Sequence, residues 1–189
     1  MDLNVGSAGL ADWEEPVSKF LKSKEQQSKI GTWSDRPGTI ASISCLNGAS
    51  IMEFLRHAVA MEGYSDERTG FSAGEDGKIL RNFPWWENSL WLPVDFEDAG
   101  TLEDDPTFFV GSCQALLRDL DALKVKSPLN LGEAPPAYAE MRADFQKFVR
   151  AGDELGLSVD DCVRWVWKAL REAAELAILE DTALWGGPD

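Results

Sequence analysis

Histidine is almost absent from this sequence, and cysteine is scarce. His57 is the single histidine among 189 residues, which excludes zinc sites built from several histidines and the His-Glu-x-x-His metalloproteases. Any histidine that acts as a general base must therefore be His57. The three cysteines, Cys45, Cys113 and Cys162, are odd in number and far apart. They indicate free thiols in a reducing compartment rather than a disulfide framework.

Long apolar runs are also missing. No stretch of 18 apolar residues occurs, so the sequence predicts no membrane-spanning helix. The N-terminus, Met1-Asp2-Leu3, does not place a basic segment before an apolar one, so no signal peptide is expected. We therefore expect a soluble, cytoplasmic protein.

Basic residues are too few to balance the acids. The chain carries 18 Lys and Arg against 33 Asp and Glu, a formal net charge of −15, and it has no basic run of five residues. Such a charge repels phosphate backbones and anionic membranes, so we expect no direct nucleic-acid binding and no membrane binding. It favours a basic protein partner, because opposite fields speed encounter.

Apolar residues, in contrast, are plentiful enough for a hydrophobic core. They make up 44% of the chain and include eight Trp and nine Phe. At about 150 residues per domain, this length predicts one domain. We expect a flexible N-terminus over residues 1–11 and a single globular domain over 12–189.

Hydrophobic periodicity predicts five helices. Their approximate ranges are 13–29, 50–62, 107–125, 136–150 and 159–180. Only about a third of the circumference of the last one is polar, so it should be the central helix and contact the 107–125 and 136–150 helices. Ser158 is expected to cap it, with Asp161 three residues on.

Short β-branched or apolar runs predict strands at 39–45, 78–83 and 89–94, the last two as a hairpin. The predicted fold class is therefore mainly α, a compact multi-helix domain of about five helices with a minor short β-sheet or hairpin.

Catalytic candidates are few. Cys113 follows Gly111-Ser112 near a helix start, where a thiolate is stabilised, so a dyad with His57 is conceivable. However, Cys113 and Cys162 fall in phase with apolar residues and are predicted to be buried. Cys45 ends a strand just before a helix, which is a better position for a nucleophile, but no orienting third group can be named.

Nucleotide, hydrolase and metal motifs are missing. The patterns G-x-x-x-x-G-K-[ST], G-x-G-x-x-G and G-x-S-x-G do not occur, and the acids at 74–77 and 95–105 do not follow the EF-hand spacing. The sequence therefore predicts no cofactor and no metal site. It carries no motif that resembles a known family.

The strongest binding signal lies between residues 84 and 105. Trp85, Trp86 and Trp91 form the densest aromatic cluster, and an acidic loop follows them. Tryptophan is enriched at binding hot spots, while core packing of a hairpin is the competing interpretation of this cluster. The candidate partner-binding residues are Trp85, Trp86, Asp95, Glu97, Asp98, Glu103, Asp104 and Asp105.

These observations favour an acidic cytosolic protein-binding module. The leading hypothesis is an inhibitor or immunity-type protein that neutralises a basic partner such as a toxin. Two alternatives stay open. One is a self-associating structural or regulatory module, a homo-oligomer that uses the apolar final helix. The other is an enzyme that uses Cys45 or paired carboxylates.

Overall fold

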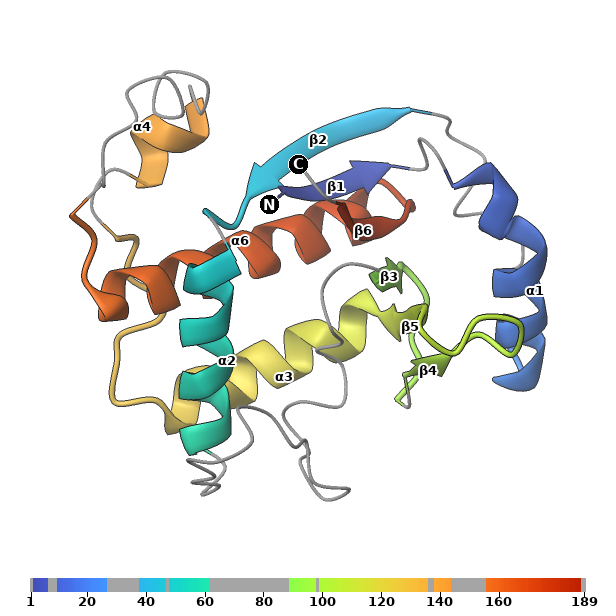
Figure 1. Cartoon of the computed structure of the whole chain (residues 1–189), viewed down its shortest axis with the longest axis horizontal. Helices are drawn as coiled ribbons and strands as arrows, with labels where there is room; N and C mark the ends of the chain where they lie inside the picture. The colour runs from blue at the N-terminus through green and yellow to red at the C-terminus, as the bar shows by residue number, and fades with distance from the viewer. Residues whose placement is uncertain are drawn as a thin grey trace.

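Six strands form one mixed sheet in the computed structural model (Figure 1). The residues that the structure describes are 2–6, 10–26, 38–46, 48–61, 89–97, 99–135, 138–143 and 156–187. In spatial order, the strands are β2 (Thr39–Ser44), β1 (Asp2–Gly6), β6 (Leu184–Gly187), β3 (Ser89–Leu92), β5 (Phe109–Ser112) and β4 (Gly100–Thr101). β3 and β5 are parallel, and every other neighbouring pair is antiparallel.

Five α-helices and one short 3₁₀ turn, η1 (Ala11–Trp13), accompany the described strands. The helices are α1 (Glu14–Ser23), α2 (Gly48–Met61), α3 (Cys113–Lys126), α4 (Tyr138–Ala143) and α6 (Val159–Leu179). The predicted cap of the last helix is confirmed: Ser158 and Asp161 form a reciprocal capping box.

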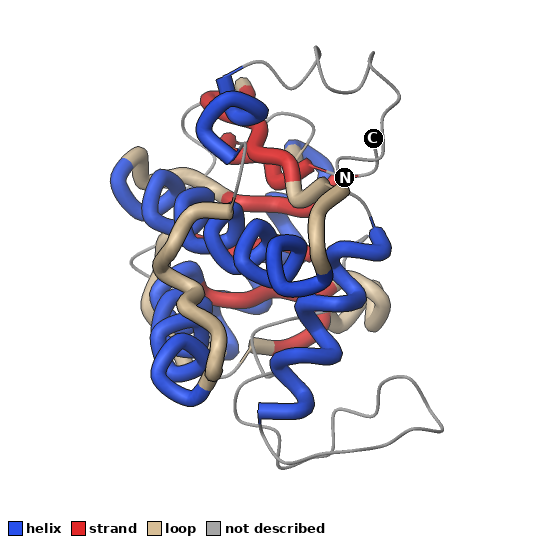
Figure 2. Tube along the Cα trace, turned by 90° about the vertical axis from the view of Figure 1, so that its left-hand side faces the viewer, coloured by secondary structure: helices blue, strands red, loops and turns tan. Residues whose placement is uncertain are grey.

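The sheet separates two hydrophobic clusters. On one face, side chains of β1 and β2 pack with α2, α3 and α6, together with the fully buried Trp91 of β3. On the other face, Leu90 and Leu92 of β3 pack with Val17 and Phe20 of α1. Adjacent residues of β3 thus enter opposite clusters, because successive side chains of a strand point to opposite faces. Figure 2 shows helices packed over the strands in a view turned by 90° from that of Figure 1.

The last helix is the centre of the larger cluster, as the sequence predicts. α6 packs against α2 and α3, and its two tryptophans tie it to other elements. Trp165 Nε1 donates to the Ser44 carbonyl at 2.9 Å, and Trp167 Nε1 donates to the Leu120 carbonyl at 3.0 Å. Tyr138 of α4 meets Trp165 edge to face, with ring centroids 4.6 Å apart.

The predicted mainly α fold class is wrong. Of the described residues, 52% are helical and 19% lie in strands, so the class is mixed α/β. The sheet was underestimated because β1 and β6 come from the two ends of the chain and meet only through tertiary pairing. In addition, β3 is buried at all four residues, and β5 occupies residues that the sequence analysis assigned to the helix at 107–125. Such short buried strands show no alternation of polar and apolar residues.

Candidate protein-binding surface

The acidic segment, which runs from Asp95 to Asp105, lies at one edge of the sheet, beside α1. It forms most of the connection from β3 to β5, and three aromatic or aliphatic residues anchor it: Phe96, Leu102 and Phe108 are all buried. Phe96 meets Phe20 of α1 edge to face at 5.8 Å between ring centroids. Phe108 stacks on Trp13 at 4.0 Å. The apolar side chains of this segment therefore face inward, which holds its acids at the surface.

The predicted acids in this segment differ in what they contact. Glu97 and Glu103 are exposed. Asp95 is paired with Arg118 of α3, with 2.8 Å between Oδ1 and Nη1. Asp104 Oδ2 lies 3.3 Å from the Lys19 ammonium of α1. The structure thus pairs two of the predicted acids, Asp95 and Asp104, with cations of this chain and leaves Glu97 and Glu103 exposed.

Asp105 has a local structural role. Its Oδ1 accepts hydrogen bonds from the backbone N–H of Thr107 at 3.0 Å and from the Thr107 hydroxyl at 2.6 Å. The hydroxyl hydrogen bond, with the backbone one, holds the pKa of the Asp105 carboxyl below its ordinary value. Asp105 therefore shapes the turn between β4 and β5 and stays ionised there.

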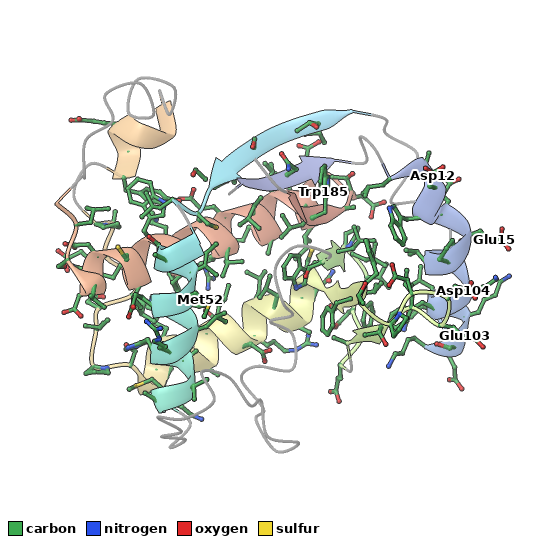
Figure 3. All side chains as sticks on the ribbon, viewed as in Figure 1. Asp12, Glu15, Met52, Glu103, Asp104 and Trp185 are labelled. Carbon is green, nitrogen blue, oxygen red and sulfur yellow. The ribbon has the colours of Figure 1, made fainter. Side chains whose placement is uncertain are left out.

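The acids that α1 adds to this surface were not among the predicted binding residues. Asp12, Glu14 and Glu15 lie in η1 and the first turn of α1, and all three are exposed. Figure 3 shows Asp12, Glu15, Asp104 and Glu103 one after another along the outer side of α1. The available signal was the acidic run beside Trp13 at a helix start, where the helix dipole stabilises negative charge. We call Asp12, Glu15, Glu97, Glu103 and Asp104 the acidic edge.

A surface hollow lies within the acidic edge. It has a volume of about 410 Å³ and is formed between α1 and the turn after β4. Phe20 and Leu102, both buried, contribute apolar surface to it, while Lys19, Glu103 and Asp104 contribute charged groups. The site is therefore a concave surface with an apolar lining and an acidic rim.

The tryptophans of the candidate site have a different outcome from the acids. Trp85, Trp86 and Asp98 lie outside the described residues. Trp91, the third tryptophan of the cluster, is fully buried in the core, so it is not a binding anchor.

The candidate nucleophiles are mostly enclosed. Cys45 and Cys113 are fully buried, and Cys162 is half-buried. Burial raises the pKa of the Cys113 thiol, which disfavours the thiolate. His57 Nε2 lies 2.8 Å from the Ser127 hydroxyl at the end of α3, and burial lowers the pKa of His57. These environments fit packing roles.

The described residues hold neither a metal-binding cluster nor a helix that could span a membrane. No group of three His, Cys, Asp or Glu side chains among them could hold a metal ion. No helix within the same ranges is long and apolar enough to cross a membrane.

The fold and the acidic edge define an acidic α/β protein with a charged, concave surface. A family described as "Putative DNA-mimic protein" matches residues 87–185, just over half of the chain, and the chain belongs to that family. The match begins just before β3 and includes α3, α6 and every acid from Asp95 to Asp105. No curated protein and no solved structure matches the chain.

The family corrects the partner expectation drawn from charge. That expectation was a basic protein partner and no direct binding of nucleic acid. A DNA mimic acts on proteins that bind DNA. The family therefore implies partners that are DNA-binding proteins, a narrower class than basic proteins in general. Charge alone could not reveal this, because repulsion of DNA and imitation of DNA both follow from excess carboxylates.

Proposed function

We propose that this protein binds a DNA-binding protein in place of DNA and so inhibits its attachment to DNA. The acidic edge is the surface that takes the place of the phosphate backbone. The membership of the chain in the DNA-mimic family carries this proposal. A nuclease toxin is one DNA-binding protein that such an inhibitor would neutralise.

The charge distribution supports the choice of this surface. DNA presents phosphates to the lysines and arginines of its proteins, and this contact supplies most of the non-specific affinity. Exposed carboxylates of the acidic edge meet the same cations. Asp12, Glu97 and Glu103 are exposed there, and no ion pair joins them to a cation within the described residues. No cation of the described residues therefore neutralises these three carboxylates directly.

The acids come from two elements whose relative position the core fixes. Phe20 and Phe96 join α1 to the β3–β5 connection through the smaller hydrophobic cluster. A preformed surface does not lose the entropy of ordering when a partner binds. Such a surface can therefore act as a rigid imitation of a rigid duplex.

The first test is competition with duplex DNA. The immobilised full chain is exposed to the proteins of the native cell that bind double-stranded DNA. We expect it to retain one or more of them, and we expect added duplex DNA to release what it retained. If it retains none of them, or if duplex DNA releases nothing, the proposal is wrong.

The second test locates the surface. A variant with Asp12→Asn, Glu97→Gln and Glu103→Gln should associate with the retained protein roughly fivefold more slowly at low salt, because exposed charges act mainly on the association rate. The matched control carries Glu140→Gln, Asp160→Asn and Asp181→Asn, which change the net charge equally at exposed positions outside the acidic edge. Equal slowing by both variants would place the interface elsewhere.

A further inference from the structure

The hollow in the acidic edge has the features of a site for one long cationic side chain. Its volume of about 410 Å³ exceeds the space of a single water, about 30 Å³, by more than tenfold. Phe20 and Leu102 are 8% and 2% exposed, so the apolar surface that they give to the hollow is part of a packed core and is held in place. The carboxylates of Glu103 and Asp104 stand at its rim.

A cation of the chain itself already occupies this rim. The Lys19 ammonium lies 3.3 Å from Asp104 Oδ2 and 3.5 Å from Glu15 Oε1. The hydrogen bond to Asp104, followed by the charge of Asp104, raises the pKa of Lys19. The Lys19 side chain is nevertheless half exposed, so it can leave this position when another cation arrives.

We infer that the hollow receives an arginine side chain of the DNA-binding partner, and that Lys19 competes with that arginine for Asp104. This inference rests on the proposed function, since the partner is a protein that uses cations to hold phosphates. The guanidinium contacts the carboxylates of Glu103 and Asp104, and the methylene stem lies over Phe20 and Leu102. Lys19 thereby lowers the affinity of the site and favours partners that offer more than a single charge.

Arginine fits the hollow better than lysine for two reasons. Its planar guanidinium presents several N–H donors in a fixed arrangement, so it can serve two carboxylates at once. It is also less strongly hydrated than an ammonium and packs well against an aromatic ring. Phe20 supplies such a ring in the lining, and Lys24 already lies over it at 5.5 Å from the ring centroid.

The binding test uses N-butylguanidinium as the probe and the full chain as the receptor. In amide NMR spectra, the probe should shift the resonances of Phe20, Thr101 and Leu102 in a saturable manner. N-butylammonium should do so more weakly, and neutral N-butylurea should not. Equal effects of guanidinium and ammonium would overturn the assignment to arginine. Shifts spread over acids far from the hollow would overturn the site.

Variants test the competition by Lys19. Lys19→Met should tighten N-butylguanidinium binding about two- to fivefold, the range expected for one exposed charge pair. Lys22→Met is the matched control, because it removes the same charge from the same helix but does not line the hollow. Asp104→Asn should weaken binding by a similar factor. If Lys19→Met and Lys22→Met have equal effects, or if Lys19→Met has none, the inference is wrong.

The same variants with a DNA-binding protein separate this inference from the proposed function. If the parent, Lys19→Met and Asp104→Asn chains all displace duplex DNA from a retained protein equally well, the proposed function stands and this inference falls. If the parent displaces no DNA from any protein, the proposed function falls, and the partner arginine falls with it even where N-butylguanidinium binds. If Lys19→Met displaces DNA at a lower concentration than the parent and Asp104→Asn needs a higher one, the result supports both the proposed function and this inference.

Discussion

Replacing Gly111 with alanine tests the packing at the centre of the sheet. Gly111 of β5 pairs with Trp91 of β3 in the parallel register. A Cβ atom at Gly111 would lie 2.9 Å from Trp91 Cδ1 and 3.3 Å from Trp91 Nε1, well inside ordinary contact distances of about 3.5–4.0 Å. Trp91 is 0% exposed and packs in the cluster of α2, α3 and α6. The indole ring therefore has no room to move aside.

The magnitude follows from two opposing effects. Overpacking a dense core costs about 1–3 kcal/mol, while Gly→Ala stabilises by about 0.4–1 kcal/mol through the unfolded chain. The net loss in the free energy of unfolding should be about 1–2 kcal/mol. For a domain of this size, that loss lowers Tm by about 2–8 °C.

Urea and thermal unfolding followed by circular dichroism measure this loss. Gly48→Ala is the matched control, because Gly48 is the first residue of α2 and an added Cβ there meets nothing within 4 Å. That change should leave stability unchanged or raise it by up to about 1 kcal/mol. If Gly111→Ala is as stable as the parent, the close packing of Trp91 against β5 is wrong.

Three further predictions concern the core, the thiols and the histidine. Val166→Asp places a carboxylate at a position that is 0% exposed, so it should lower the free energy of unfolding by about 4 kcal/mol or more. Val125→Asp, at a position that is 86% exposed, should lower it by less than about 0.5 kcal/mol. Similar losses for the two variants would contradict the assigned core. Under native conditions at pH 8, iodoacetamide should label Cys162 faster than Cys45 and Cys113, because only Cys162 is partly accessible, and equal labelling of Cys113 would contradict its burial. Burial lowers the pKa of folded His57 below the ordinary 6.5. The unfolded state therefore takes up the proton first, and the free energy of unfolding should fall as the pH drops below about 6.5. His57→Gln should flatten this pH dependence of the urea midpoint, and an unchanged slope would show that His57 is not its source.

Helices with a strong amphipathic stripe and a local cap could be predicted from the sequence. The helix expected at 159–180 is α6, Val159–Leu179, because its stripe and the Ser158 cap are both local signals. The helix expected at 107–125 is α3, Cys113–Lys126, which begins six residues later than expected. The difference is β5, whose burial depends on pairing with β3. Pairing between distant segments leaves little trace in a local window.

The sheet was harder to predict for the same reason. The expected strand at 89–94 is β3, Ser89–Leu92, but its described neighbours are β5 and β6. The expected partner at 78–83 lies outside the described residues. Residues 2–6, which the sequence analysis left without structure, pair with both β2 and β6. Register of this kind comes from contacts between the two ends of the chain.

The acidic edge shows the same division between local and non-local information. The acids from Asp95 to Asp105 were visible in the sequence as a cluster. The contribution of Asp12 and Glu15 was not, because it depends on α1 packing beside the β3–β5 connection through Phe20 and Phe96. The role of Asp105 in a turn was also hidden, since an acidic run does not show which carboxylate accepts backbone hydrogen bonds.

Net charge does not distinguish one face of the protein from another, but the pairing of charges does. On α6, three cations each have an acid of the same helix as a partner: Arg164 with Asp161, Lys168 with Glu172, and Arg171 with Glu175.

These helix pairs leave little net field on that side, because opposite charges a few ångströms apart cancel beyond a Debye length of about 8 Å. At the acidic edge, within the described residues, Lys19 is shared by Glu15 and Asp104, while no ion pair engages Asp12, Glu97 or Glu103. Within the described residues, three cations of α6 thus have an acidic partner on the same helix, whereas three acids of the acidic edge have no ion pair, which supports the acidic edge as the proposed binding surface.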